Sequence, residues 1–553
     1  MKLRTYLYYI LLCALAVVAS QCNSRSVSTA SASEIPHLQK QGTATQLIVD
    51  GKPFLALSGE LLNNSATSLE YMRPIWPKLV ATKLNSVVAG VSWAQVEPQE
   101  GKFDFSVPDG VIQEARSHNL RLILIWFASW KNGYSSYVPD WVKADFQRFP
   151  RAQITGGESI ELLSPSSDTN RDADARAFAA LMRHVKEIDG REHTVIMIQV
   201  ENEIGMERDS RDRSPMADKV YEAPVPKELM DYLQQHKDTL IPEFRKVWEK
   251  AGFKTSGTWE QVFGKGTSPD EIFMAWNFGR YVGRVAEAGK AEYPIPMYAN
   301  AWLYGFAKSD QRPNSQSGSP MPDVMDVWRA GAPKIDLLGP DIYGFDFVVM
   351  CANYTQSGNP LFIPEGPGGA VAATRALYAF GHHDAIGISP FGIDGMAGHD
   401  PELAGIYDLL SRLSPLILEH QGKGTMSAVL LRPEDTSQKV QVGNYTLEGR
   451  ASRRRVAPGA PAPAPSRNEP LPGAIFIAIG PNEFLAAGRD VSVTFTANTP
   501  GPPHVGLATV EAGDYVNGRW VPGRRLAGDD DGQGQRLELR NMGLQRFTLY
   551  RFQ

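Results

Sequence analysis

The chain has 553 residues, of which 42% are hydrophobic and 21% charged, an ordinary globular composition with enough material for one large barrel and a smaller domain. Its 56 Lys and Arg nearly balance its 61 Asp and Glu, for a net charge of −5, so the composition gives no indication of nucleic-acid binding or of a polybasic membrane surface. Only three cysteines are present, which excludes a disulfide framework and leaves stability to the core.

The first 21 residues have the pattern of a secretory signal peptide. A basic start is followed by an apolar run over residues 10–18 and then by small residues. That run is shorter than the ~20 residues that a membrane-spanning helix needs, and no later apolar stretch is long enough. We therefore expect an exported protein, periplasmic or outer-membrane-associated. Cys22 would allow a lipoprotein, although Gln21 stands where such signals prefer Gly or Ala.

The segment after the signal predicts a lead-in and then a hairpin. Residues 22–44, rich in Ser, Thr and Ala, are expected to be flexible. Residues 45–49 and the Asp-Gly pair after them predict a strand and a tight turn. The next strand, over residues 54–60, ends on the carboxylate of Glu60.

From Glu60 onward, strands and helices alternate up to residue 421. Apolar residues recur at helical spacing between short runs rich in β-branched residues. Seven further strands are predicted, at residues 86–91, 120–127, 194–200, 295–300, 335–343, 361–365 and 386–391. Eight strands alternating with helices predict an α/β fold, a (β/α)8 TIM barrel over residues 45–421, rather than an open doubly wound sheet. No Gly-rich phosphate loop follows the first strand, which counts against a nucleotide-binding fold.

Two segments stand apart from this alternation. Residues 206–270 form a long polar insertion with a helix of its own, predicted at residues 228–251, and such insertions usually shape the rim of a barrel active site. Residues 422–553 predict an antiparallel β-sandwich-like domain. Its strands are expected at residues 426–431, 440–442, 474–479, 491–495 and 545–552. Within it, the Pro/Ala-rich residues 450–472 predict a loop or linker.

Carboxylates stand at the predicted carboxyl ends of four barrel strands, at Glu60, Glu203, Asp341 and Glu365. Catalytic groups of such barrels lie at this end, where the βα loops form the open face. Glu203 follows the fourth strand and Glu365 the seventh, so they face each other across the barrel. Glycoside hydrolysis needs two facing carboxyls, one to protonate the leaving oxygen and one to attack or to activate water. Glu203 and Glu365 are therefore predicted as the catalytic pair.

Aromatic residues also gather at or just beyond these strand ends, where their faces could stack on sugar rings. Taken one at a time, each would more readily be a core residue, but five at the same end favour a role in binding. They are Trp93, Trp126, Trp130, Trp302 and Tyr343.

The run Gln199-Val200-Glu201-Asn202-Glu203 resembles the Q-x-E-N-E signature of glycoside hydrolase family 35, retaining β-galactosidases of clan A. Other segments resemble further motifs of that family or clan, in the form of its bacterial xyloglucan-acting members with an extra C-terminal β domain. They are residues 58–60 (S-G-E), 93–105 (W-A-Q-V-E-P, then G-K-F-D-F), 128–133 (A-S-W-K-N-G), 362–365 (F-I-P-E), 480–484 and 506–508.

The resemblance implies a role for several residues. Glu203 would be the acid/base and Glu365 the nucleophile, at ~5 to 5.5 Å from each other as in retaining enzymes. Asn202 would bind the sugar 2-hydroxyl, and Tyr343 would contact the nucleophile. The remaining substrate-binding residues would be Glu60, Trp93, Ser129, Asn132 and Trp302. The implied function is removal of terminal galactose from plant cell-wall oligosaccharides such as xyloglucan fragments.

Two departures weaken the galactose assignment more than the catalytic class. Ser129 replaces the family's galactose-binding Glu, and Gly90 replaces a Tyr, so the sugar pocket could be wider. A β-glucoside, β-mannoside or β-arabinoside substrate remains open, as does a non-catalytic carbohydrate-binding envelope protein. No metal or cofactor is expected, because the adjacent His382 and His383 would point apart. An oligosaccharide or polysaccharide-derived substrate is the expected partner, and an oligomer is possible.

Overall fold

A computed structural model describes residues 34–303, 316–344, 347–452 and 469–553. The predicted signal peptide, Cys22 and most of the Pro/Ala-rich loop lie outside the described residues. Within the described ranges, no helix combines the length and the apolar character needed to cross a bilayer.

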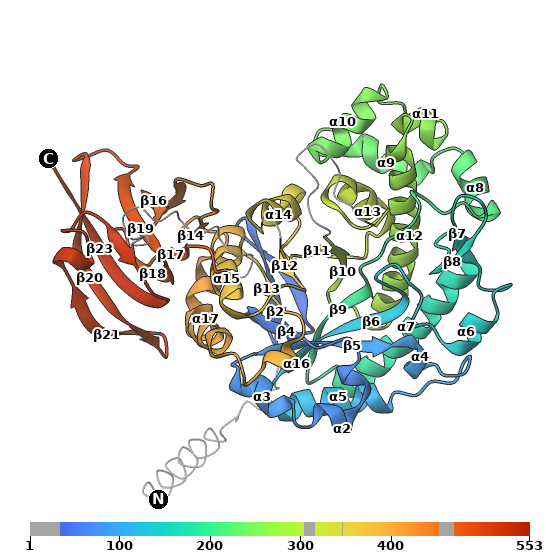
Figure 1. The fold of residues 1–553 in the computed structure, drawn as a ribbon, viewed down its shortest axis with the longest axis horizontal. Coiled ribbons are helices and arrows are strands. Elements are labelled where there is room, and N and C mark those ends of the chain that lie inside the picture. Colours follow the sequence, from blue (N-terminus) through green and yellow to red (C-terminus); the bar gives the residue numbers. More distant parts are fainter. Residues whose placement is uncertain (1–33, 304–315, 345–346, 453–468) are drawn as a thin grey trace, which may run out of the picture. The chain divides into compact units, whose positions relative to one another are not determined.

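Eight parallel strands form one sheet in the order β11-β10-β9-β6-β5-β4-β13-β12, surrounded by helices (Figure 1). The sheet closes between β11 and β12. Ile342 N donates to Glu365 O at 3.0 Å, and the Asn359 side chain accepts from Leu338 N and donates to Leu338 O. The predicted TIM barrel is therefore confirmed. Its strands are β4 (Ala56–Glu60), β5 (Ser86–Ser92), β6 (Arg121–Lys131), β9 (Val195–Asn202), β10 (Met297–Trp302), β11 (Leu337–Asp341), β12 (Phe362–Ile363) and β13 (Gly387–Ile388).

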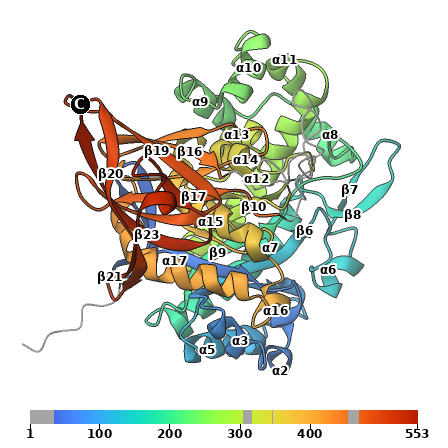
Figure 2. The ribbon, with the colours of Figure 1, turned by 60° about the vertical axis from the view of Figure 1, so that its left-hand side comes forward.

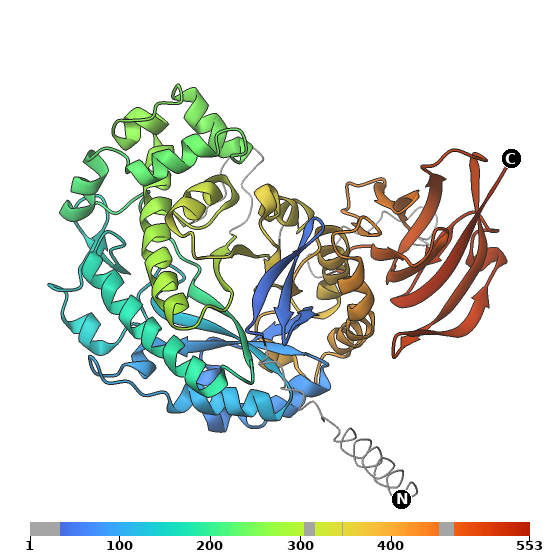
Figure 3. The ribbon, with the colours of Figure 1, turned by 180° about the vertical axis from the view of Figure 1, so that it is seen from behind.

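Helices cover the outside of the strands and bury their apolar faces against them (Figure 3). The longest are α7 (Asp168–Asp189) and α12 (Thr267–Glu292), which lie side by side in close packing: a Cβ built on Gly289 would come 2.2 Å from the Phe178 ring. The other helices of the ring are α2 (Leu69–Met72), α3 (Trp76–Ala81), α4 (Trp93–Val96), α5 (Ser106–Ser117), α6 (Asp140–Ala144), α13 (Met325–Gly331), α14 (Phe347–Tyr354), α15 (Gly369–His383), α16 (Ile393–Met396) and α17 (Pro401–His420).

An N-terminal three-stranded sheet closes one end of the barrel. It comprises β1 (His37–Gln41), β2 (Ala44–Val49) and β3 (Lys52–Phe54), all antiparallel. Leu47 and Val49 belong to the apolar cluster inside the barrel, together with residues near the starts of the barrel strands. The opposite end, where the strands finish, is thus left for the functional side chains. The prediction that residues 22–44 are flexible throughout is wrong for β1, whose polar residues gain their order from pairing with β2.

The insertion after β9 folds into four short helices, and the single helix predicted at residues 228–251 is wrong. That segment contains two helices with a break at residues 236–241. Pro242 stands at the first position of the second helix, where its missing N–H costs nothing, whereas in a continuous helix it would remove a hydrogen bond. The four helices are α8 (Pro215–Glu222), α9 (Lys227–Gln235), α10 (Pro242–Lys250) and α11 (Trp259–Phe263).

The C-terminal region forms two antiparallel sheets, ordered β14-β17-β18-β23-β20-β21 and β15-β16-β19-β22 (Figure 2). Apolar residues of both sheets share one core, including Leu447, Phe476 and Phe547, which confirms the predicted sandwich-like domain. The first sheet packs against the barrel helix α15: a Cβ on Gly381 would meet Ile475 at 2.7 Å. The strands are β14 (Met426–Leu430), β15 (Gln438–Val442), β16 (Tyr445–Ala451), β17 (Gly473–Ala478), β18 (Glu483–Arg489), β19 (Val491–Ala497), β20 (His504–Val516), β21 (Arg519–Leu526), β22 (Leu537–Leu539) and β23 (Gly543–Phe552).

Half of these ten strands were not predicted from sequence. The missed strands are β16, β18, β20, β21 and β22, and several are rich in Gly, Ala or charged residues, which lack a clear alternating pattern. β16 also extends to Ala451, so the predicted loop begins inside a strand.

Candidate active site

The end of β9 carries an unusual backbone. Glu201 and Glu203 have φ values of 63° and 46°, both in the left-handed region that non-glycine residues seldom adopt. Asn300, on the neighbouring strand, accepts a hydrogen bond from Glu203 N at 2.8 Å through its side-chain oxygen. Such local strain persists only where the surroundings hold it, and it concentrates at functional sites. Here it turns Asn202 and Glu203 toward the open end of the barrel.

Glu201 anchors this turn from below. Its carboxyl accepts the backbone N–H groups of Ser129 at 3.2 Å and Trp130 at 2.7 Å, which ties the end of β9 to β6. The side chain is fully buried next to Asp174. Burial, and then the neighbouring Asp174, raise the pKa of Glu201 well above its usual range. Glu201 therefore supports the site without reaching its surface.

The two predicted catalytic residues do meet. Oxygen atoms of Glu203, Asp341 and Glu365 lie within 4.8 Å of one another, and all three side chains are buried. This closest approach of their oxygens is compatible with the ~5 to 5.5 Å between the carboxyl groups of retaining enzymes. Inverting enzymes hold the two groups about 6.5 Å or more apart to make room for a water molecule.

The environment of Glu203 suits a proton donor. Burial, and then the negative charge of Glu365, raise the pKa of Glu203 from 4.5 to about 8, while Lys131 acts in the opposite direction. Asn132 donates its side-chain N–H to Glu203 Oε2. At neutral pH this carboxyl therefore holds a proton that it can deliver to a leaving group.

The environment of Glu365 suits a carboxylate. Tyr343 donates its hydroxyl to Oε2 at 2.7 Å, and Asn202 donates its amide N–H to Oε1 at 3.3 Å. Burial, and then Glu365 itself, raise the pKa of Tyr343 well above its ordinary value, so the phenol keeps its hydrogen. Two donors on one carboxyl stabilise negative charge on it, as a nucleophile needs.

Glu60, at the end of the first barrel strand, is a further carboxyl of the site. Both of its carboxyl oxygens are buried and make no hydrogen bond within the described residues. Burial, and then Glu365, raise the pKa of Glu60 well above its usual range. A buried polar group without a partner is costly, and a sugar hydroxyl would satisfy it. This position agrees with the predicted substrate-binding role.

Three of the five predicted stacking aromatics do not reach the site. Trp93, Trp126 and Trp130 are fully buried between the barrel sheet and its helices. Each indole N–H is used there, by Glu97 at 2.8 Å, by Asp174 at 2.8 Å and by the Leu163 carbonyl at 3.1 Å, respectively. The stacking prediction is therefore wrong for these three. Tyr343 is 37% exposed, and Trp302, at the end of β10, is partly exposed.

Ser129 also faces away from the mouth. Its hydroxyl donates to Asp174 at 2.5 Å and lies 2.6 Å from the Tyr281 hydroxyl, in the layer between the sheet and α7 and α12. The cause is an irregularity in the pairing of β6 with β9 between Trp126 and Lys131, which reverses the side-chain alternation there. Ser129 therefore does not bind substrate in this structure, and Lys131, two residues further on, points into the site instead.

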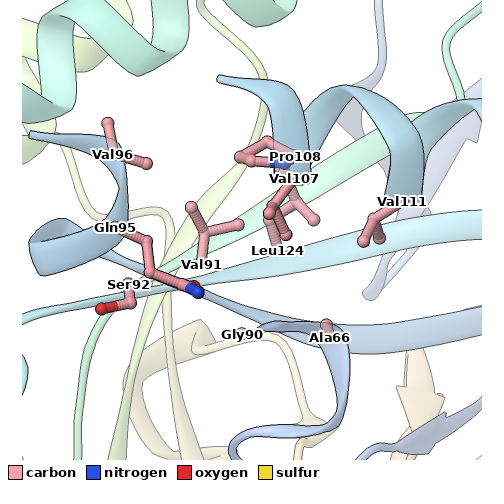
Figure 4. Close-up of a pocket in the computed structure, with 10 residues that line it drawn as sticks. All are labelled: Ala66, Gly90, Val91, Ser92, Gln95, Val96, Val107, Pro108, Val111 and Leu124. Atoms are coloured by element: carbon pink, nitrogen blue, oxygen red, sulfur yellow. The ribbon is translucent and has the colours of Figure 1, made fainter. Parts of the chain in front are cut away.

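Gly90 does not widen the site either. A Cβ built on it would lie 2.3 Å from the Phe127 ring, so that ring already occupies the space. Gly90 also lines a separate, mostly apolar pocket over α5 with Val91, Val107 and Leu124 (Figure 4). None of the residues lining that pocket belongs to the carboxyl cluster.

Among the described residues, Glu203, Asp341 and Glu365 are also the group whose donor atoms are close enough to hold a metal ion. Several of their oxygens already accept hydrogen bonds, whereas Asp341 Oδ1 has no hydrogen-bond partner among the described residues. Asn132, Tyr343 and Asn202 donate to the two glutamates, and Asn300 donates to Asp341 Oδ2 at 2.8 Å. Protons on the carboxyls whose pKa is raised account for the charge balance, and we assign no metal to the site.

Two family models match parts of the chain. Residues 72–268 match the family described as "Beta-galactosidase", glycoside hydrolase family 42, and residues 403–538 match a domain of unknown function, DUF5597. A curated β-galactosidase of Xanthomonas manihotis is 32% identical over 190 residues, which are 33% of this chain and 28% of that protein. The chain thus matches less than a third of the length of this relative. Family 42 rather than family 35 is named, so the finer resemblance is not confirmed, while a clan A glycoside hydrolase is supported.

Solved structures are similar to parts of the chain as well. The β-galactosidases of Rahnella sp. R3 and of Bacillus circulans sp. alkalophilus are each 16% identical to it, with a TM-score of 0.45 over 66% of this chain and 57% of theirs. The catalytic domain of a β-amylase from Paenibacillus polymyxa is 11% identical, with a TM-score of 0.44 over 64% of this chain and 97% of that domain.

Proposed function

We propose that the chain is a retaining, exo-acting β-glycosidase of the β-galactosidase type. One observation carries this proposal. A buried carboxyl that holds its proton at neutral pH, Glu203, has an oxygen within 4.8 Å of an oxygen of a second carboxyl, Glu365, which is held by two hydrogen-bond donors. Both lie at the end of a TIM barrel where catalytic groups are found.

The reaction proceeds in two displacements. Glu365 attacks the anomeric carbon while Glu203 protonates the departing glycosidic oxygen, which leaves a covalent glycosyl ester on Glu365. Esterification removes the negative charge of Glu365, and with it the second-largest cause of the raised pKa of Glu203. Glu203 then takes a proton from water, which displaces the ester, and the sugar leaves with the configuration it had at the start.

The finer substrate assignment is terminal β-galactose on plant cell-wall oligosaccharides such as xyloglucan fragments. It rests on the sequence segments that resemble xyloglucan-acting enzymes and on the names of the related β-galactosidases. The signal-like residues 1–21 support an exported, periplasmic or outer-membrane-associated location.

A β-glycosidase for another sugar is the nearest alternative, because Ser129 stands where the galactose-binding Glu would be and lies away from the mouth. A non-catalytic carbohydrate-binding protein is the alternative from a different class. It is disfavoured because binding alone has no use for a protonated carboxyl facing a second one within 4.8 Å.

A substrate panel tests the proposal. Aryl β-galactoside, β-glucoside, β-mannoside and β-arabinoside would be offered alongside galactosylated xyloglucan fragments, with ¹H NMR following the first anomer released. We expect β-galactoside hydrolysis with the β-anomer appearing first. An α-anomer first would contradict retention, preference for another glycoside would contradict the galactose assignment, and no turnover with any of them would favour the binding protein.

A further inference from the structure

Lys131 is the one cation of the carboxyl cluster among the described residues, and it lies at the end of β6. Only 8% of this residue is exposed. Its ammonium donates to Asn202 Oδ1 at 2.7 Å and lies 3.7 Å from Glu203 Oε2. Neither sequence pattern nor resemblance selects it.

The contact with Asn202 determines which way the amide group faces. A lysine ammonium has hydrogens to donate and no lone pair to accept with, so the oxygen of the amide must point to Lys131. The nitrogen of the amide is then directed to the other side, where it donates to Glu365 at 3.3 Å. An arriving sugar hydroxyl next to Glu365 therefore meets a donor at Asn202, not an acceptor.

The contact with Glu203 matters for the second step of the reaction. The charged groups around Glu203 are Asp341 at the end of the sixth strand, Glu365 after the seventh, Glu60 at the end of the first and Lys131 at the end of the third. Of these groups, Glu365 raises the pKa of Glu203, while Lys131 and a hydrogen bond with Asp341 lower it. Lys131 therefore stabilises the carboxylate that Glu203 becomes once it has protonated the leaving oxygen, and this carboxylate is the form that activates water.

We propose that Lys131 is a positioning residue for the reaction: it orients the Asn202 amide toward the nucleophile and stabilises the carboxylate that Glu203 becomes once it has protonated the leaving oxygen. This inference rests on the proposed function. It adds a residue that acts through Asn202 and Glu203 and need not touch the sugar itself.

Lys131→Met tests it, because methionine keeps most of the length of the side chain and removes the charge. With an aryl β-galactoside, the alkaline limb of kcat/KM should move up by about one pH unit, since an opposite charge within ~4 to 6 Å lowers a carboxyl pKa by about that much or more. Hydrolysis of the glycosyl ester should slow by at least about tenfold, the usual size of a general-base effect being larger still. A rapid burst of aryl alcohol should then precede a slow steady state, with kcat and KM falling together.

A second readout isolates the amide. Removing the 2-hydroxyl from the substrate should cost the wild type about tenfold more in kcat/KM than it costs Lys131→Met, because a hydrogen bond from a fixed donor is lost in only the first case. Lys131→Arg should restore both the alkaline limb and the sensitivity to the 2-hydroxyl. Lys143→Met, at an exposed lysine that bonds only the Ser136 carbonyl, is the matched control and should behave as wild type.

The outcomes separate cleanly. Suppose that the wild type is active and that Lys131→Met has the same pH profile, the same burst and the same loss of kcat/KM on the 2-deoxy substrate. This result would overturn the inference and leave the proposed function standing. An inactive wild type would overturn both. If Lys131→Met fails to fold, Lys131→Arg decides the question, since loss of the 2-hydroxyl effect in that folded, charged variant would contradict the role assigned to the ammonium.

Discussion

Tyr343 donates its hydroxyl hydrogen to Glu365 across 2.7 Å, from just beyond the sixth barrel strand to just beyond the seventh. The bond orients the carboxylate that the proposed mechanism uses as nucleophile. Tyr343→Phe removes this donor while keeping the ring. We expect kcat to fall about ten- to hundredfold, the equivalent of one hydrogen bond to a charged group, with little change in the unfolding temperature. Tyr134→Phe, at an exposed tyrosine, is the control, and steady-state kinetics that do not distinguish the two variants would refute the assignment.

Glu365→Gly should abolish turnover of aryl β-galactosides, because no nucleophile remains. Azide is small enough to enter the space left by the side chain and should restore turnover, giving an α-galactosyl azide that NMR identifies. Glu158→Gly, at an exposed carboxylate paired with Arg208, should need no rescue. Residual activity near that of the wild type, or rescue with a β-product, would exclude Glu365 as nucleophile.

Glu203 should lower the stability of the fold in a pH-dependent way. Since its pKa is raised from 4.5 to about 8, the folded state binds this proton more tightly than the unfolded chain does. Stability is therefore fully present below about pH 4.5, falls as the pH rises to about 8, and falls no further above that. Glu203→Gln has no such proton to lose. Scanning calorimetry should find it more stable than the wild type by a few kcal/mol at pH 8 and equal to it near pH 4. A pH-independent difference would contradict the burial argument.

Ser129→Ala should affect stability and leave substrate binding unchanged. The hydroxyl serves the buried Asp174, and its removal leaves that carboxyl short of a partner at a cost of about 1 to 3 kcal/mol. Urea unfolding measures this loss, and KM for the aryl galactoside should stay that of the wild type. Ser136→Ala, at an exposed serine in the segment after β6, is the control. A raised KM with unchanged stability would return Ser129 to the substrate site.

Chelation should leave activity unchanged. A cation would have to compete with Asn132, which donates to Glu203 Oε2, and with Tyr343 and Asn202, which donate to the two oxygens of Glu365. Dialysis against EDTA, followed by assay with and without added Mg²⁺ or Ca²⁺, checks this. Loss of turnover that either ion restores would show that the three clustered carboxyls hold a metal after all.

Glu203 and Glu365 could be found from the sequence because the apolar run of a buried strand and the residue that ends it are both local features. A buried strand is recognised by its apolar run, and the residue that ends it is read directly from the chain. The barrel rule then places such ends on one face, whatever the distance along the chain. The resemblance implied that Tyr343 contacts the nucleophile, and its hydroxyl does donate to Glu365. Asn202, for which the resemblance implied binding of the 2-hydroxyl, also donates to Glu365.

Side-chain direction within a strand could not be read in this way. Strict alternation would put Ser129 and Lys131 on the same face, and the irregular pairing between β6 and β9 separates them. At that irregularity Glu201, which is on a different strand, accepts the N–H groups of Ser129 and Trp130. The three misplaced tryptophans follow from the same limit, because an indole at a strand end can face either the mouth or the helix layer.

The chain by itself thus determined that there is a barrel, that it carries a β-rich domain, and which strand ends bear carboxyls, because hydrophobic periodicity and strand ends are properties of neighbouring residues. Only the tertiary structure decided which side chains enter the site and the direction in which the pKa of Glu203 is shifted. The reason is that burial, pairing irregularities and the charges of Glu365 and Lys131 around Glu203 come from segments far apart in the chain.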